Sequence, residues 1–171
     1  MQIILLRKPI RNKKNLNLRM DRLTKEQRKK NMQAVKNKNS RIELLLGKEL
    51  RNRGLRYRKN DKTVPGKPDF CFKGLKIAVF CDSEFWHGKN WEVRKHDHKS
   101  NQDFWIAKIE RNIERDRKVN EILAEAGWTI LRFWGKDIIK DPDGCAETVL
   151  SEVIGKKSES KPQINIARHD F

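Results

Sequence analysis

The residues with the clearest chemical potential stand in the stretch Phe80–Trp91, which reads FCDSEFWHGKNW. Asp82 precedes the aromatic pair Phe85 and Trp86, and His87 follows that pair directly. A histidine accepts a proton from water near neutral pH when a carboxylate steadies its other ring nitrogen. The stretch follows the apolar run LKIAVF, so a buried strand is predicted to end in a group able to act as a general base.

A second carboxylate, Asp69, follows the turn VPGKP and opens the short run DFCF. Asp and Pro are common in turns, and plain turn chemistry stays open as an alternative for this residue. If DFCF pairs as a hairpin with the strand that ends near Asp82, the two carboxylates lie at the same end of the sheet. Mg²⁺ prefers one or two carboxylates, with water and substrate oxygens completing its shell. The pair therefore predicts a catalytic Mg²⁺ site beside a phosphodiester.

Other titratable groups have simpler alternatives. Glu43 is the acid expected to steady His87, but it stands three residues after Ser40, the glutamate position of a capping box, and spacing alone favours the cap. His96 and His98 have the spacing of metal ligands but lack cysteine partners, so we interpret them as loop residues.

Two groups of side chains are candidates for contact with nucleic acid. Phe85 and Trp86 fit an ordinary core, but aromatics on a polar loop of a basic protein also stack on bases or wedge between them. Lys108, Asn112 and Arg115 share one face of a predicted helix. A solvated charged face is the usual interpretation, and only the overall charge of the chain favours contact with phosphates.

Composition narrows the class of partner. The chain has 171 residues, enough for one domain, and its 40 Lys and Arg against 23 Asp and Glu give a net charge of +17. Such an excess predicts a polyanion partner, most commonly nucleic acid. The sequence has no long apolar run that predicts membrane contact. Its widely spaced cysteines, Cys71, Cys81 and Cys145, fit a reducing cytoplasm and predict neither disulfides nor a Cys-rich zinc site.

The elements that must position these residues follow from periodicity and turn residues. A mixed α/β domain is expected over 20–155, with a basic extension at 1–19 and a polar tail at 156–171. The expected order is a capped helix from Thr24 to about Val35, a helix from Ser40 to Gly54, an edge strand in LRYRKND, a hairpin of DFCF and LKIAVFC, a loop over 88–101, a helix over 103–126, a strand in WTILRFW, and a helix from Pro142.

Several stretches in series resemble one family. They are KNMQAVKNKNSRIELLLGKELRNRGLRYR, VPGKPDF, FWHG and FWIAKIERNIERDRKVNEILAEAGWTILRFW, and together they span about Leu23 to Trp134. The series is similar to the very-short-patch repair endonucleases. The resemblance implies a restriction-endonuclease-like core related to the PD-(D/E)xK nucleases. It also implies Mg²⁺-dependent nicking of one strand beside a T:G mismatch.

The resemblance also implies roles for individual residues. Asp69 would be the principal metal ligand and the backbone carbonyl of Cys81 a second. His87 would be the general base, steadied by Glu43. Phe85 and Trp86 would form the wedge that enters the duplex, with Met32 pressing from the other groove.

The chain departs from the family at the positions that bind a structural zinc. Glu84 stands at the first cysteine position, and Lys89 and Trp91 stand at about the next two. Gly135-Lys136 follows the later strand where another cysteine is usual. We therefore expect no structural zinc. Asp82 replaces a histidine of the family, and acids at this point are metal ligands in the wider superfamily, which leaves T:G specificity open.

The sequence thus predicts a Mg²⁺-dependent DNA endonuclease that nicks double-stranded DNA at T:G mismatches, a cytoplasmic monomer that acts alongside mismatch-repair proteins. Two alternatives remain. One is a restriction-like, homing-type or phage endonuclease with another target on the same fold. The other is a DNA-binding module that has lost catalysis.

Overall fold

The computed structural model describes residues 24, 26–27, 30, 39–95 and 101–159. The chain divides into two units, 1–35 and 36–171, and each is considered by itself. In the first unit the expected capping box is confirmed. The amide of Thr24 donates to Gln27 Oε1 at 2.8 Å and the amide of Gln27 donates to Thr24 Oγ1 at 3.2 Å. Met32, His96 and His98 lie outside the described residues.

The second unit is built on a four-stranded mixed sheet in the order β1-β2-β3-β4. The strands are β1 (Arg58–Lys59), β2 (Phe70–Phe72), β3 (Ile77–Asp82) and β4 (Thr129–Trp134). The expected hairpin is confirmed: β2 pairs antiparallel with β3 across the 3₁₀ turn Lys73–Leu75. β4 pairs parallel with β3, and Asp82 lies opposite Trp134. β3 and β4 therefore end at the same edge of the sheet, and antiparallel β2 begins there.

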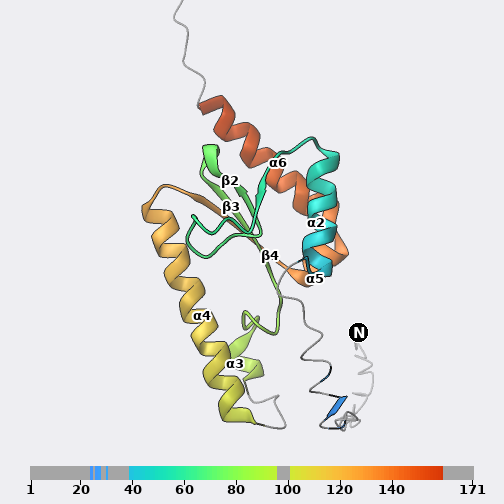
Figure 1. Cartoon of the computed structure of the whole chain (residues 1–171), viewed down its shortest axis with the longest axis vertical. Coiled ribbons are helices and arrows are strands. Elements are labelled where there is room, and N and C mark those ends of the chain that lie inside the picture. Colours follow the sequence, from blue (N-terminus) through green and yellow to red (C-terminus); the bar gives the residue numbers. More distant parts are fainter. Residues whose placement is uncertain (1–23, 25, 28–29, 31–38, 96–100, 160–171) are drawn as a thin grey trace, which may run out of the picture. The chain divides into compact units, whose positions relative to one another are not determined.

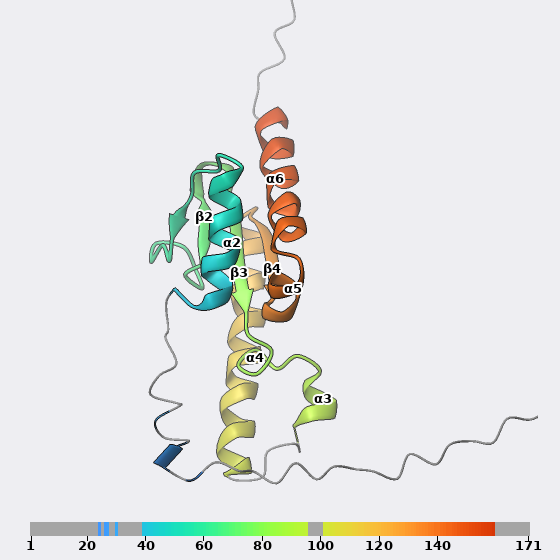
Figure 2. The same cartoon turned by 90° about the vertical axis from the view of Figure 1, so that its right-hand side faces the viewer.

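Helices cover both faces of the sheet (Figures 1 and 2). α2 (Arg41–Asn52), α5 (Gly135–Lys140) and α6 (Pro142–Glu159) lie on one face, and α4 (Gln102–Glu125) lies on the other. The short α3 (Trp91–Arg94) lies beside the N-terminal half of α4 in both views. This mixed sheet between helices confirms the predicted fold class. Among the described residues, no helix combines the length and apolar composition needed to cross a bilayer.

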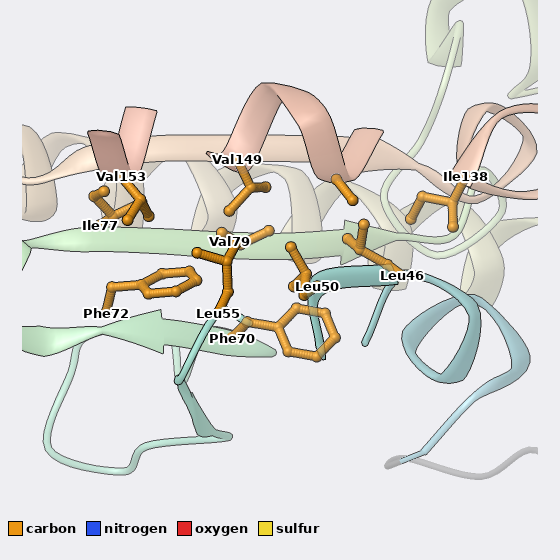
Figure 3. Packing of buried hydrophobic residues seen from close by; sticks show 11 residues of the cluster. Leu46, Leu50, Leu55, Phe70, Phe72, Ile77, Val79, Ile138, Val149 and Val153 are labelled. Atoms are coloured by element: carbon orange, nitrogen blue, oxygen red, sulfur yellow. The ribbon is translucent and has the colours of Figure 1, made fainter. Parts of the chain in front are cut away.

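The larger core fills the face under α2, α5 and α6 (Figure 3). Phe70, Ile77 and Val79 point from the sheet toward side chains of α2 and α6. Leu46 and Leu50 of α2 are fully buried there, as their helical spacing predicts. The buried residues of this cluster are Leu46, Leu50, Leu55, Phe70, Phe72, Ile77, Val79, Ile138, Ala146, Val149 and Val153.

A smaller core lies under α4. Alternate residues of a strand face opposite sides, so Ala78 and Phe80 of β3 pack toward Val119 and Leu123 of α4. Ile122 directly precedes Leu123 in the apolar repeat of this helix, but it is 50% exposed. The buried residue one turn before Leu123 is Val119. Charged residues surround Val119 in the sequence, so no apolar pattern marks it as buried.

Three boundaries differ from expectation. α3 forms inside the segment expected to be a loop, and α5 forms directly after β4, where no helix was expected. α6 continues through Glu159, so the tail predicted from Lys156 begins as helix.

Candidate active site

Asp69 stands at the start of β2, where the turn Val64–Pro68 delivers it to the edge at which β3 ends. Oδ2 of Asp69 accepts a hydrogen bond from the amide of Cys81 at 2.7 Å. Burial, together with the charges of Glu43 and Asp82, raises the pKa of Asp69 to about 6, although the Cys81 amide and the charge of His87 act to lower it. No basic side chain forms an ion pair with Asp69 within the described part of the chain. It is therefore a partly buried carboxylate that lacks a compensating cation.

Asp82 continues the row of β3 that faces α4, and its side chain is only 6% exposed. Arg132 of β4 reaches Asp82 Oδ2 at 3.3 Å and Asp116 Oδ1 of α4 at 3.5 Å. The same guanidinium lies 4.4 Å from the centre of the Phe80 ring, which supports it from below. Burial raises the pKa of Asp82, opposed by the charges of His87 and Arg132. Unlike Asp69, Asp82 is already compensated by side chains of the protein.

His87 is held by Asp116. Its Nδ1 lies 2.6 Å from Asp116 Oδ2 and 3.4 Å from Asp82 Oδ1. Burial opposes ionisation of Asp116, but the hydrogen bond and charge of His87, with Arg132, keep its pKa below the ordinary value. An ionised Asp116 fixes the imidazole with Nδ1 toward the carboxylate. Nε2 is then the ring nitrogen that can take a proton.

Glu43 makes different contacts from those the resemblance implied. Its Oε1 accepts from the amide and hydroxyl of Ser40 at 3.1 and 2.8 Å, and its Oε2 accepts from the amide of Asn39 at 2.9 Å. The capping box favoured by spacing is thus confirmed at the start of α2. The partner expected for His87 was wrong, because the cap occupies both oxygens of Glu43 and Asp116 takes that place. Glu43 still acts on the site through its charge, which raises the pKa of Asp69.

Phe85 and Trp86 pack in an aromatic cluster with a residue of α4. Their rings meet edge to face at 4.9 Å, and the ring of Trp105 lies 5.5 Å from Phe85 and 5.8 Å from Trp86. The ammonium of Lys108 lies 5.0 Å from the centre of the Trp86 ring. Both members of the pair are half-buried, so neither the core nor the exposed-loop interpretation describes them alone.

The shared helix face of Lys108, Asn112 and Arg115 is present, but it is not simply solvated. Asn112 Nδ2 donates to the carbonyl of Trp86 at 3.0 Å, and Arg115 reaches Asp116 Oδ1 at 3.1 Å. The predicted phosphate face therefore borders the aromatic cluster and the His87–Asp116 pair.

Gly88 explains how the loop lies so close to α4. It has φ +65°, and a Cβ there would stand 2.5 Å from Ile113 Cδ1. A larger residue would require the Ile113 side chain or the loop to shift, and it would also have to adopt an unfavourable positive φ.

The donor set fits a hard divalent cation better than a soft one. No three His, Cys, Asp or Glu side chains of the described residues converge as a ready metal cluster. Mg²⁺ does not need one, because it binds through one or two carboxylates and keeps several waters. Asp69 has the features of such a ligand, whereas Asp82 is engaged by Arg132. The thiol of Cys81 is raised in pKa by burial, so only its backbone carbonyl is a candidate ligand.

Sequence reasoning did not assign roles to Asp116, Arg132 or Trp105. A signal existed for Asp116, which lies four residues after Asn112 on the same helix face. Arg132 carried a weaker signal as a charged residue within the apolar run WTILRFW. Neither signal says which partner the side chain meets, because the partners are on other elements.

Comparisons with known proteins agree with this geometry. The model of the family "DNA mismatch endonuclease Vsr" matches residues 20–93. The chain is 61% identical over 125 residues to the type II nicking enzyme V.HpaIIP of Haemophilus parainfluenzae, covering 72% of this chain and 89% of the relative. It is 56% identical over 144 residues to the type II nicking enzyme V.NmeDIP of Neisseria meningitidis serogroup C, covering 84% and 97%.

A more distant relative links the chain to the protein that carries the family's name. The DNA mismatch endonuclease Vsr of Escherichia coli strain K12 is 36% identical over 110 residues, which cover 64% of this chain and 70% of that protein. With the mixed sheet and the acidic, histidine-bearing edge already described, these similarities show that the chain belongs to the Vsr family of DNA mismatch endonucleases and is a DNA endonuclease.

Proposed function

We propose that this endonuclease nicks one strand of double-stranded DNA at T:G mismatches in a Mg²⁺-dependent reaction. The observation that carries the proposal concerns Asp69, which has no ion-pair partner among the described residues. The charge of His87 acts on this carboxylate, and His87 is itself hydrogen-bonded to Asp116. The names of the relatives V.HpaIIP and V.NmeDIP, both type II nicking enzymes, support single-strand cleavage.

Asp69 is the side chain that would hold Mg²⁺, together with the backbone carbonyl of Cys81. The bound ion would supply positive charge to the scissile phosphodiester. Asp82 contributes differently from the expected second metal ligand. Because Arg132 and His87 engage its two oxygens, we assign it to holding the imidazole rather than the ion.

His87 is the general base of the proposed reaction. With Nδ1–H donated to Asp116, Nε2 takes a proton from the attacking water. The water oxygen forms a bond to phosphorus and the bond from phosphorus to the 3′ oxygen breaks. The 3′ oxygen then takes a proton from solvent, which leaves a 3′-hydroxyl and a 5′-phosphate.

The surface beside the site supplies the contacts to the duplex. Phe85 and Trp86 would enter it as a wedge, and the contacts of their rings with Trp105 of α4 support this role. Lys108 and Arg115 lie on the adjoining face of α4, where phosphates of a bound duplex would pass. The net charge of +17 predicts binding that weakens steeply with salt.

A second candidate is the same reaction at another target. The Asp82–Arg132 pair favours it, because this pair stands where the family resemblance implies a histidine. The alternative changes what is recognised and leaves the roles of Asp69 and His87 as they are.

The test is a nicking assay on duplexes of one sequence that carry T:G, each other mismatch, or none. Each duplex is incubated with wild type or Asp69→Asn, with Mg²⁺ or with a chelator. We expect one nicked strand, on the T:G duplex only, with wild type and Mg²⁺ only. Equal rates on matched and T:G duplexes would select the second candidate. Equal binding by both proteins without cleavage by either would leave only a DNA-binding module.

A further inference from the structure

The loop that carries His87 leaves the sheet next to another chain segment. Because β3 and β4 are parallel and Asp82 lies opposite Trp134, the loop 83–90 and the start of α5 emerge side by side. The loop has only turn structure of its own, with His87 N bonded to Ser83 O and Lys89 N bonded to Glu84 O, each at 3.0 Å. Its position therefore depends on contacts with neighbouring elements.

Glu84 makes the strongest of these contacts. Its Oε1 accepts a hydrogen bond from the backbone amide of Lys136 at 2.6 Å. Hydrogen bonds from an amide to an ionised carboxylate are shorter and stronger than those between neutral groups. The carboxylate also packs against the backbone at Gly135, where a Cβ would stand 3.4 Å from Glu84 Oε2, an ordinary van der Waals contact. The beginning of the loop is thus tied to the first turn of α5.

Lys89 ties the far side of His87 to the same segment. Its ammonium lies 3.5 Å from Asp137 Oδ2 and 5.1 Å from the centre of the Trp134 ring. Asp137 is 58% exposed, so the ion pair alone is a weak contact and the indole face adds to it. The Lys89 and Trp134 side chains also line a pocket that reaches His87.

The opposite side of the loop is fixed to α4. Asn112 binds the carbonyl of Trp86, and Gly88 packs against Ile113. His87 therefore stands between an attachment to α4 and an attachment to the start of α5.

We propose that Glu84 and Lys89 are positioning residues that hold His87 and the Phe85–Trp86 pair in register with Asp69. Together with the Lys136 amide, Asp137 and Trp134, they form what we term the α5 clasp. The expected change in kcat rests on the proposed function. The expected changes in the exchange of the Lys136 amide and in the His87 signal do not. The hydrogen bonds between β3 and β4 end at Asp82 and Trp134. Beyond that point, a carboxylate, an ammonium and an indole join the loop 83–90 to the start of α5. Loss of the clasp is expected to lower kcat rather than duplex affinity, because misplacement of a catalytic group slows the chemical step.

The experiment compares Glu84→Ala, Glu84→Gln, Lys89→Met and Asp137→Asn in the full chain. Nicking kinetics on the T:G duplex are measured beside NMR exchange of the Lys136 amide and the Nδ1–H signal of His87. Glu84→Ala is expected to lower kcat about tenfold, with KM nearly unchanged, and to speed Lys136 exchange about tenfold. Glu84→Gln retains an acceptor and is expected to lie between Ala and wild type. Asp137→Asn is expected to lower kcat less than Glu84→Ala does, because its ion pair with Lys89 is exposed.

Glu121→Ala is the matched control, since Glu121 pairs only with Arg117 on the outer face of α4 among the described contacts and should change none of the three readouts. Unchanged Lys136 exchange in Glu84→Ala would overturn the clasp. Faster exchange with unchanged kcat and an unchanged His87 signal would overturn its positioning role. If wild type nicks no duplex, the proposed function fails, and the two NMR readouts still decide the clasp. If Glu84→Ala does not fold, Glu84→Gln and Lys89→Met carry the same comparison.

Discussion

The two faces of the sheet are built from the same strands but pack against different kinds of side chain. Toward α2 and α6, β3 presents Ile77 and Val79 to a core made only of apolar side chains. Toward α4, it presents Ala78 and Phe80 and then Asp82, where the packing changes from apolar to ionic. The ionic part is tolerated because Arg132 lies beside both Asp82 and Asp116, whereas Asp69 has no ion-pair partner among the described residues. The apolar face therefore sets stability, and the other face gives up some stability at one edge for chemistry.

The largest expected effect is on activity, from the α4 face. Asp69→Asn preserves the shape and an acceptor for the Cys81 amide but removes the charge that would hold a cation. We expect nicking to fall at least about 10³-fold, equivalent to about 4 kcal/mol of transition-state stabilisation. Single-turnover assays with excess enzyme check this. Glu125→Gln, an exposed acid near the end of α4, is the control, and equal losses in both variants would contradict the assignment.

The next effect is on stability, from the apolar face. Leu46→Ala removes a fully buried side chain of α2, and we expect the free energy of unfolding to fall by about 2–5 kcal/mol. Urea denaturation measures it, with Leu44→Ala as the control, because Leu44 is on the same helix but 53% exposed. The folded fraction should nick at the wild-type rate. A large loss of kcat in folded Leu46→Ala would show that the two faces are not separable.

Asp116→Asn tests the partner of the proposed base. The amide side chain fits the same space but no longer stabilises the imidazolium that forms when His87 takes a proton. We expect kcat to fall about 10²-fold with little change in KM. Glu114→Gln provides the control, since Glu114 is half-exposed on the same helix and pairs with Arg117. A Glu43→Gln variant that lost more kcat than Asp116→Asn would restore Glu43 as the steadying group.

A smaller effect connects Asp69 to pH. The pKa of Asp69 is raised to about 6 in the folded chain, so the folded state binds this proton more tightly than the unfolded state. The stabilisation from its protonation is complete below about pH 4 and is lost as pH rises through about 6. Without divalent metal, Asp69→Asn should therefore raise the free energy of unfolding by about 1–3 kcal/mol at pH 8 and by little near pH 4.

Thermal denaturation at both pH values checks the sign of this effect. Added Mg²⁺ should stabilise wild type at pH 8 and leave Asp69→Asn unchanged. A variant less stable than wild type at pH 8 would show that the Asp69 charge is compensated within the fold.

The smallest expected signal is in the zinc content. Glu84, Lys89 and Trp91 supply no thiolate, so elemental analysis of the purified protein should find no stoichiometric zinc. One zinc per chain would mean that the alignment around Glu84 is wrong. The α5 clasp would then need to be re-examined as well.

Sequence analysis predicted the elements whose patterns are local. The hairpin of β2 and β3, the long α4 and the Ser40 cap follow from alternation, helical period and capping spacing, and each is confirmed. α3 and α5 were missed because short helices carry too little periodicity to stand out from loops. Val119 was missed because one apolar residue among charges does not mark a buried face.

By itself, the sequence predicted an acidic and histidine-based site at a strand end, and it determined the large positive charge of the protein. Those properties follow from residue types and short spacings. Only the tertiary structure decided which acid meets which base. It placed Asp116 and Arg132, from α4 and β4, beside His87 and Asp82, and left Glu43 to its helix cap. The physical reason is that side-chain pairing across elements depends on the register and packing of distant segments, which no local pattern encodes.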